Sequence, residues 1–216
     1  MLPCEVSIDS LYDEAAYYRM LFRERTHDAA FYLRTIPCEA SVLELGVGDG
    51  RMAVALARER RRVVGVDNSL PMLHALEERL ANEPADVRSR IETAHGDSRY
   101  IRLDERFAWA ACPFNGLAHF HTSDAQAELL TTVRHHLMAG GRFAFDVMLP
   151  DPKLLSGGGS SVSRLVHPRT GRICRLEETY TYDAMRQVLT VETHLIDRET
   201  GDRQTLTLSL LSLIHI

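Results

Sequence analysis

The stretch that most constrains the fold runs from Ser41 to Arg51 and reads SVLELGVGDGR. A short apolar run over residues 42–45 meets three glycines at alternate positions, and an Ala- and Arg-rich segment follows directly. This order predicts a strand, a tight turn and a helix. Alternate glycines let the backbone turn sharply and let a ligand lie against it, because no Cβ is in the way. The helix N-terminus behind the turn supplies free N–H groups.

The glycines, Gly46, Gly48 and Gly50, do not fit the dinucleotide fingerprint G-x-G-x-x-G, since Arg51 stands where its third glycine belongs. Asp49 would repel a pyrophosphate and offset the attraction of the helix end. Glu44 adds a second acid at the end of the strand. Two carboxylates without a phosphate cradle suit a nucleoside with an amino group and a positive centre, a description that S-adenosylmethionine meets. Asp49 could also, or instead, cap the helix.

The pattern E-L-G-x-G-x-G-R over residues 44–51 resembles the first motif of class I S-adenosylmethionine-dependent methyltransferases. The family usually has Thr or Ser where Asp49 stands. The resemblance implies an α/β fold with a doubly wound, mostly parallel sheet, S-adenosylmethionine as the cofactor, and methyl transfer to N or O of a small-molecule acceptor. It also implies that these residues bind the cofactor: Glu44, Gly46, Gly48, Asp49, Gly50 and Arg51.

The second predicted strand, RVVGVD over residues 62–67, ends in Asp67. An acid at this position can accept both hydroxyls of an adenosine ribose, a feature that NAD-binding folds share. Asp67 could instead cap the next helix, although Ser69 fits that role better. The segment resembles the family's D-x-S-x-x-M-L pattern, which places Asn68 at the cofactor and Met72 beside the adenine. The alternative for Met72 is a plain core residue.

Two further segments resemble family motifs at the ends of predicted strands. Gly96-Asp97, at the end of the third predicted strand (residues 91–97), resembles the family's G-D pair, whose acid accepts from the adenine amino group; a simple turn Asp is the alternative. The fourth predicted strand, FAWAAC over residues 107–112, leads into a segment that resembles the family's P-F-N-x-L-x-H. The resemblance adds these residues to the cofactor site: Gly96, Asp97, Ser98, Pro113, Phe114 and Asn115.

No catalytic residue follows from the motifs. A general base is needed only if the acceptor arrives protonated. His119 and His121 are candidates because they are the imidazoles of the loop after the fourth strand. Tyr17 and Tyr18 are candidates from the N-terminal segment. The alternative for each is a structural role.

Three regions are expected along the chain. Residues 1–37 are rich in aromatic side chains at near-helical spacing and predict one or two helices, which form a lid over the site in the family or simply pack on the sheet. Residues 38–150 form the cofactor-binding α/β core, with a helix capped by Ser123-Asp124 that ends at Gly140-Gly141. Its fifth strand covers residues 143–148.

The third region, residues 151–216, is expected to be an antiparallel β appendage, since three strand patterns at 173–182, 187–196 and 204–211 follow without helices between them. Residues 150–152 are expected to end regular structure, and the Gly- and Ser-rich patch at 156–161 to be a hinge or loop tip. The resemblance covers about Leu11 to Leu210. Because the family sheet normally has two more strands, we expect a C-terminally truncated reading frame.

Composition limits the possible partners and location. The 216 residues are 45% hydrophobic and 25% charged, which is ordinary for a globular protein. The net charge of −5 argues against nucleic-acid binding. Four cysteines without a C-x-x-C pair indicate free thiols in a reducing compartment, with no metal site. No apolar run spans a membrane, so a cytoplasmic enzyme is expected.

Two other functions are compatible with the motifs. One is an NAD-dependent oxidoreductase, which the glycine spacing and Asp49 disfavour. The other is a protein or fragment that binds S-adenosylmethionine or S-adenosylhomocysteine without catalysis. The sequence does not identify the acceptor or the oligomeric state.

Overall fold

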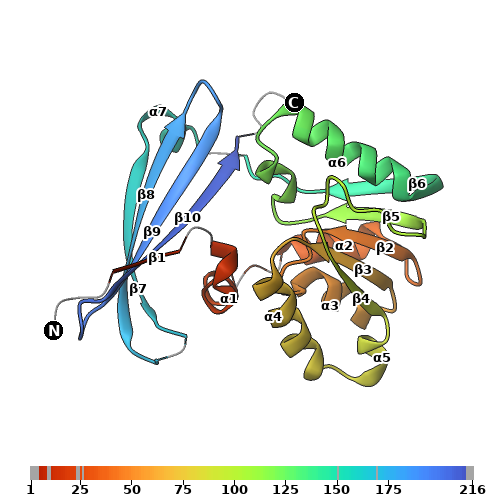
Figure 1. Cartoon of the computed structure of the whole chain (residues 1–216), viewed down its shortest axis with the longest axis horizontal. Helices are drawn as coiled ribbons and strands as arrows, with labels where there is room; N and C mark the ends of the chain where they lie inside the picture. The colour runs from red at the N-terminus through yellow and green to blue at the C-terminus, as the bar shows by residue number, and fades with distance from the viewer. Residues whose placement is uncertain are drawn as a thin grey trace. The chain divides into compact units, whose positions relative to one another are not determined.

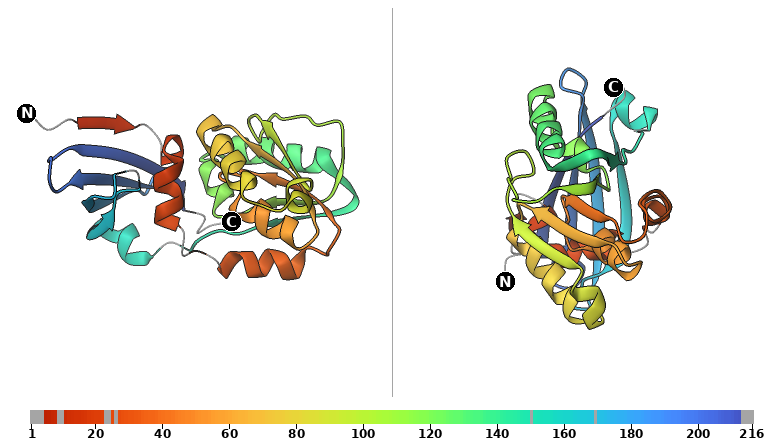
Figure 2. Two further views of the ribbon diagram at one scale, coloured as in Figure 1. Left: turned by 90° about the horizontal axis from the view of Figure 1, so that it is seen from below. Right: turned by 90° about the vertical axis from the view of Figure 1, so that its right-hand side faces the viewer.

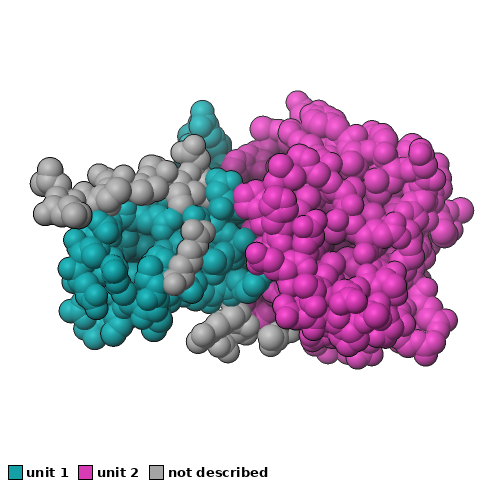
Figure 3. Space-filling view, turned by 60° about the horizontal axis from the view of Figure 1, so that its bottom comes forward, with its two compact units in different colours: residues 1–21, 148–216 teal, residues 22–147 magenta. Residues whose placement is uncertain are grey.

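A computed structural model describes residues 5–8, 11–22, 25, 27–149, 151–168 and 170–212. The chain divides into two compact units, drawn in different colours in Figure 3. One unit holds residues 22–147, and the other combines residues 1–21 with residues 148–216. Each unit contains one five-stranded sheet (Figure 1).

The unit of residues 22–147 has the predicted parallel sheet. Its elements are α2 (His27–Thr35), β2 (Ser41–Leu45), α3 (Arg51–Arg58), β3 (Arg62–Asp67), α4 (Leu70–Ala81), α5 (Ala85–Arg88), β4 (Ile91–His95), β5 (Phe107–Cys112), the 3-10 helix η2 (Gly116–His119), α6 (Ser123–His136) and β6 (Leu137–Phe145). The strand order is β4-β3-β2-β5-β6, and every neighbouring pair is parallel. This order confirms the doubly wound α/β prediction.

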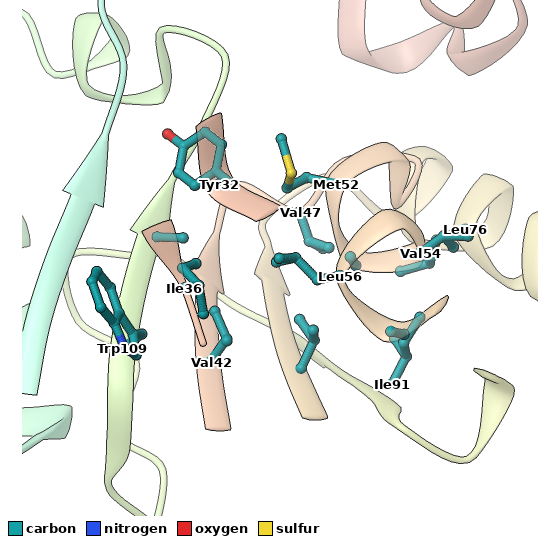
Figure 4. Close-up of a cluster of buried hydrophobic side chains, with 14 of the residues drawn as sticks. Tyr32, Ile36, Val42, Val47, Met52, Val54, Leu56, Leu76, Ile91 and Trp109 are labelled. Carbon is teal, nitrogen blue, oxygen red and sulfur yellow. The ribbon is translucent and has the colours of Figure 1, made fainter. Parts of the chain in front are cut away.

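A hydrophobic cluster fills the space between this sheet and α2, α3 and α4 (Figure 4). Val42 and Val63 reach it from neighbouring strands, and Leu56 reaches it from α3. Because successive side chains of a strand point to opposite faces, Leu43 and Leu45 lie on the other face. Both are buried as well. The sheet is therefore covered on both faces, and α6 lies along β5 and β6 in Figures 1 and 2.

The ends of two helices show how local sequence sets this fold. Ser69 caps α4, and its side chain accepts a hydrogen bond from the Met72 N–H at 3.3 Å, as predicted. Thr122, one residue before the predicted cap, caps α6. The predicted end of α6 at Gly140-Gly141 is wrong, since the helix ends at His136 and β6 begins at Leu137. Gly140 instead has φ +75°, and the β5–β6 register shifts between Phe107 and Trp109. The glycine pair therefore accommodates the irregular pairing of β6 with β5.

The other unit is built on an antiparallel sheet of β7, β8, β9 and β10, to which β1 adds in parallel beside β10. Its elements are β1 (Glu5–Ile8), the 3-10 helix η1 (Leu11–Asp13), α1 (Ala15–Phe22, which ends at the boundary), α7 (Pro152–Gly157), β7 (Gly159–Val166), β8 (Ile173–Asp183), β9 (Val188–Asp197) and β10 (Arg203–Leu211). The three predicted appendage strands are β8, β9 and β10, within one residue at each end.

The hinge or loop tip expected at residues 156–161 is wrong, and so is the end of regular structure expected at residues 150–152, because α7 and β7 cover this segment. Asp151 caps α7, and its carboxylate accepts from the Lys153 N–H at 2.9 Å. Gly158, with φ +68°, ends that helix, and a Cβ at this position would lie 2.4 Å from the Tyr180 carbonyl oxygen. The glycine therefore allows a close approach of two backbone segments, and β7 follows directly. A Gly- and Ser-rich sequence is compatible both with a helix end followed by a strand and with a flexible loop.

The N-terminal segment is shared between the two units. Within one unit, η1 contacts β10. Within the other, α2 packs against α3. The unit boundary at residues 21 and 22 thus divides the predicted lid of residues 1–37, and its lid function stays a prediction. Some positions used in the sequence analysis lie outside the described residues. They are Cys4, Pro150 and residues 213–216. Cys38, Cys112 and Cys174 are free thiols.

Candidate cofactor site

The glycine turn lies at the carboxyl end of the central strand β2. The Gly46 and Val47 N–H groups donate to the Val66 carbonyl at 2.8 and 3.0 Å, which anchors the turn to β3. Gly46, Gly48 and Gly50 have φ values of +76°, +56° and +78°, so the turn needs residues without a Cβ. No atom of the described residues lies within 4 Å of the position of a Cβ on Gly46. The backbone of Gly46 therefore faces open space at the edge where ligands of parallel sheets bind.

Glu44 is the most unusual side chain of the turn. It is only 1% exposed, and its strand neighbours Gly65 and Ala111 offer no polar side chain. Its Oε2 atom is buried and has no hydrogen-bond partner among the described residues. Burial raises the pKa of this carboxyl to about 8, although Arg51 opposes the shift. A buried acid with an unsatisfied oxygen fits a ligand that brings a cationic donor.

Asp67 lies at the end of β3, beside the turn. Its carboxylate accepts from the Gly48 N–H at 2.7 Å and from the Ser69 N–H at 2.9 Å. Burial raises its pKa above the usual range, while these backbone N–H groups oppose the shift. Each carboxylate oxygen can accept a second hydrogen bond. Asp67 therefore has the capacity to accept the two hydroxyls of a ribose while it holds the turn.

Asp49 is not the N-cap residue of α3, because Gly50 holds that position. Asp49 is 3% exposed and forms an ion pair with Arg79 of α4. This pair weakens the charge argument against a pyrophosphate, because Arg79 partly neutralises the acid. The sequence does not reveal the pair, since the two residues belong to different elements.

Arg51 begins α3 and forms a two-pronged ion pair with Asp28 of α2. The two nitrogen–oxygen distances are 2.8 and 2.5 Å, and Arg51 also donates to the Arg25 carbonyl at 3.2 Å. Burial alone would raise the pKa of Asp28, but the Arg51 guanidinium outweighs it and the pKa lies below its usual range. Arg51 thus fixes the segment before the sheet to the glycine turn. Sequence reasoning missed Asp28, because nothing in its local pattern marks it.

The predicted adenine contacts lie at the ends of β3 and β4. Asp97 is half-buried, and Arg99 donates to both its oxygens at 2.6 to 3.1 Å, which holds the pKa of Asp97 below its usual range. Gly96 and Ser98 flank it and are partly buried, and Asn68 is exposed. Met72 is fully buried, with its Cε atom 3.2 Å from the Cβ position of Gly48. In this structure Met72 is a core residue that supports the turn.

The loop after β5 carries Pro113, Phe114 and Asn115. Phe114 and Asn115 have φ values of +58° and +59°, an uncommon conformation for residues other than glycine. Their N–H groups donate to the Asp146 carboxylate at 2.7 and 3.4 Å. The Phe114 ring has the Arg25 guanidinium over its face, 4.3 Å from the ring centre, and contacts Phe22 edge-on. Sequence reasoning missed Asp146, which it assigned only to a strand.

The candidate bases differ in their surroundings. His119 lies in η2, and burial, with a contribution from His121, lowers its pKa to about 4. It is therefore neutral at pH 7, but it is a weak base. His121 is exposed. In the other unit, the Tyr17 hydroxyl lies 2.6 Å from the Nε2 atom of His167, and the Tyr18 ring packs against Tyr12.

Comparisons with known proteins show which proteins this chain resembles. A family model described as a methyltransferase domain matches residues 42–141. Cypemycin N-terminal methyltransferase from Streptomyces sp is 30% identical over 152 residues, which are 70% of this chain and 58% of that protein. The chain thus spans less than two thirds of the length of this relative.

Solved structures share the fold over most of the chain. The CcbJ methyltransferase from Streptomyces caelestis has a TM-score of 0.72 at 24% identity, covering 94% of this chain and 81% of that one. The sugar N-methyltransferase KedS8 from Streptoalloteichus sp has a TM-score of 0.72 at 19% identity, covering 90% and 77%. At these identities the likeness concerns the fold.

Two features are absent from the described residues. They contain no group of three or more His, Cys, Asp or Glu side chains arranged to hold a metal ion. None of the helices in this part of the chain has the length and apolar character needed to cross a membrane. The family model covers the glycine turn, Asp67, Asp97 and the loop after β5, which are the positions that carried the resemblance in the sequence. Residues 42–141 thus form a methyltransferase domain of the class I S-adenosylmethionine-dependent kind that the sequence resembles.

Proposed function

We propose that this chain binds S-adenosylmethionine at the β2–α3 turn and transfers its methyl group to a nitrogen of a small-molecule acceptor. The observation that carries the proposal is the buried Glu44 carboxyl. Its Oε2 atom has no hydrogen-bond partner among the described residues, and these residues also leave the space over Gly46 open. The amino group of S-adenosylmethionine would supply the missing donor. A pyrophosphate would bring only acceptors to this acid.

The residues of the chain have separate tasks in this proposal. S-adenosylmethionine, when bound, supplies a methyl group activated by its sulfonium. Asp67 would accept the ribose hydroxyls, Gly46 would allow the ligand to lie against the backbone, and Asp97 would face the adenine amino group. The chain must also orient the acceptor and exclude water. His119 is too weak a base in the ligand-free chain to take a proton readily, which favours an acceptor that arrives neutral.

Nitrogen is favoured over oxygen by the names of two relatives. One is an N-terminal methyltransferase and the other a sugar N-methyltransferase. An uncharged amine carries its own nucleophilic electron pair, whereas a hydroxyl needs a base to remove its proton.

A direct test uses methyl-deuterated S-adenosylmethionine and two amine probes, a short peptide with a free N-terminus and glucosamine. Mass spectrometry should find the label on the nitrogen of at least one probe. The matched controls are the N-acetylated peptide and N-acetylglucosamine, which keep every hydroxyl but lose the nucleophilic amine. Label on the acetylated probes would contradict the nitrogen assignment. Binding without transfer to any amine would favour a non-catalytic binding protein.

Asp67→Ala should weaken S-adenosylhomocysteine binding by about 1.5–3 kcal/mol, because charged hydrogen bonds to the ribose are lost. Calorimetry measures the change, and thermal unfolding checks that the turn survives the loss of the Gly48 contact. Asp97→Ala is the matched control. It should weaken S-adenosylhomocysteine binding less than Asp67→Ala does, since Arg99 already pairs with the Asp97 carboxylate. An unchanged dissociation constant for Asp67→Ala would show that the ribose assignment is wrong.

Glu44 should make the stability of the ligand-free chain depend on pH. The folded chain keeps the Glu44 proton up to a pKa of about 8, whereas the unfolded chain loses it near the ordinary glutamate pKa of 4.5. The unfolded state therefore binds fewer protons in this window, and the free energy of unfolding falls as pH rises from about 4.5 to about 8. Urea unfolding at several pH values measures the slope.

The matched control for this prediction is Glu44→Gln, which keeps the shape and removes the titration. The free energy of unfolding of wild type minus that of Glu44→Gln should decline with rising pH and level off above about pH 8. Equal slopes in both proteins would show that Glu44 is ionised throughout. Cofactor binding at pH 7 should also release protons from wild type only, which calorimetry in two buffers of different ionisation enthalpy detects.

A further inference from the structure

Asp146 lies one residue beyond β6, next to the loop that follows β5. The two strands are parallel neighbours, with Cys112 opposite Phe145, so their carboxyl ends reach the same edge of the sheet. Asp146 Oδ1 accepts from the Phe114 N–H at 2.7 Å, and Oδ2 accepts from the Asn115 N–H at 3.4 Å. One carboxylate thus engages two successive backbone N–H groups of the neighbouring loop.

These two residues hold an unfavourable backbone conformation. Phe114 and Asn115 have φ values of +58° and +59°, where a Cβ crowds the backbone. Asparagine tolerates this region, but phenylalanine is rarely found there. Strained residues persist when their surroundings hold them, and they cluster at functional sites. Here the carboxylate of Asp146 supplies that restraint.

A third donor fixes the carboxylate itself. The Tyr32 hydroxyl donates to Asp146 Oδ1 at 2.8 Å, and Tyr32 is fully buried in the core cluster (Figure 4). Burial and the neighbouring Asp146 charge raise the pKa of Tyr32 far above its usual range, so the phenol keeps its proton and remains a donor. The core of the unit therefore orients Asp146, and Asp146 in turn orients the loop.

The loop conformation also decides where the Phe114 ring lies. The Arg25 and Arg51 guanidinium groups lie 4.3 and 5.4 Å from the ring centre. Arg51 begins the helix after the glycine turn and pairs with Asp28. A change in the loop backbone would therefore move a ring that packs against the edge of the proposed cofactor site.

We propose that Asp146 is a positioning residue for the methyl-transfer site, which holds the Phe114-Asn115 backbone in its left-handed conformation and thereby places this loop against the cofactor. The role in transfer rests on the proposed function, but the restraint on the loop does not. Asp146 touches neither cofactor nor acceptor in this proposal. It acts only through the loop.

The test is a double-mutant cycle of Asp146→Ala and Asn115→Gly. Glycine adopts positive φ without a Cβ penalty, so it should replace part of the restraint. Asp146→Ala should weaken S-adenosylhomocysteine binding by about 10-fold in the wild-type background and by about 3-fold or less in the Asn115→Gly background. If Asp146 merely stabilises the fold, its substitution should weaken binding by the same factor in both backgrounds.

A second readout needs no ligand. Asp146→Ala should raise amide hydrogen exchange at residues 114 and 115 and shift their Cα resonances away from left-handed values, while the rest of the sheet stays protected. The comparison variant is Tyr32→Phe, which removes the donor that orients Asp146 but leaves both loop bonds, so protection at residues 114 and 115 should fall less than in Asp146→Ala. Unchanged resonances in Asp146→Ala, a uniform loss of protection, or additive effects in the cycle would overturn the proposal. If wild type binds no S-adenosylhomocysteine, the proposed function fails, and the exchange data alone decide whether Asp146 restrains the loop.

Discussion

Gly46→Ala is expected to weaken binding of S-adenosylmethionine and S-adenosylhomocysteine by about 100-fold or more. The Cβ position of Gly46 is open, so the methyl group meets no atom of the part of the chain that the structure describes. It would instead occupy the place where the proposed ligand would lie against the backbone of the turn. Calorimetric titration measures the loss. A fall in stability is also expected, because alanine is strained at φ +76°.

Gly140→Ala is the matched control for this substitution. Gly140 has φ +75° and also has open space at its Cβ position, but it lies within β6 and away from the turn. Both variants should therefore lose about 1–2 kcal/mol of stability from backbone strain. Only Gly46→Ala should lose binding. Equal affinities in the two variants would show that no ligand approaches Gly46.

Gly50→Ala is expected to lower the free energy of unfolding by about 2–5 kcal/mol, from backbone strain together with overpacking. Gly50 has φ +78°, and its Cβ would lie 2.0 Å from the Cδ1 atom of Leu76. Leu76 is fully buried in the core cluster and has no room to move without displacing its neighbours. Urea unfolding measures the loss, which combines strain and overpacking.

Gly140→Ala separates those two contributions, because it has the same strain without the overpacking. The difference in stability between Gly50→Ala and Gly140→Ala estimates the cost of the Leu76 contact alone. Adding Leu76→Ala should relieve the overpacking, so that Gly50→Ala costs less in that background. Equal losses in Gly50→Ala and Gly140→Ala would show that α3 and α4 are less closely packed than the structure indicates.

The sequence predicted the parallel sheet because buried strands appear as continuous apolar runs. The run at residues 62–67 matches β3, and the run at residues 107–112 matches β5. The antiparallel strands were equally clear from their polar turns. The end of α6 was predicted wrongly, since Gly140-Gly141 signals a helix stop as well as a strand irregularity. Local patterns cannot separate these alternatives when the neighbouring strand decides between them.

The sequence pointed only to those candidate site residues that lie within a short motif. Glu44, the glycines and Asp67 lie within short patterns, and the structure gathers them at the carboxyl ends of β2 and β3. The partners Arg79, Asp28 and Asp146 come from other elements, and only the folded chain brings them to Asp49, Arg51 and the loop after β5. Such pairs depend on packing over long sequence separations.

The most direct test of the central claim is calorimetric titration of the wild-type chain with S-adenosylmethionine, S-adenosylhomocysteine and NAD under one condition. The first two should bind at one site and compete with each other, whereas NAD should neither bind nor displace them. The Glu44 carboxyl and the open space over Gly46 are the reasons for this preference. Tighter binding of NAD than of S-adenosylhomocysteine would show that the β2–α3 turn is a dinucleotide site instead.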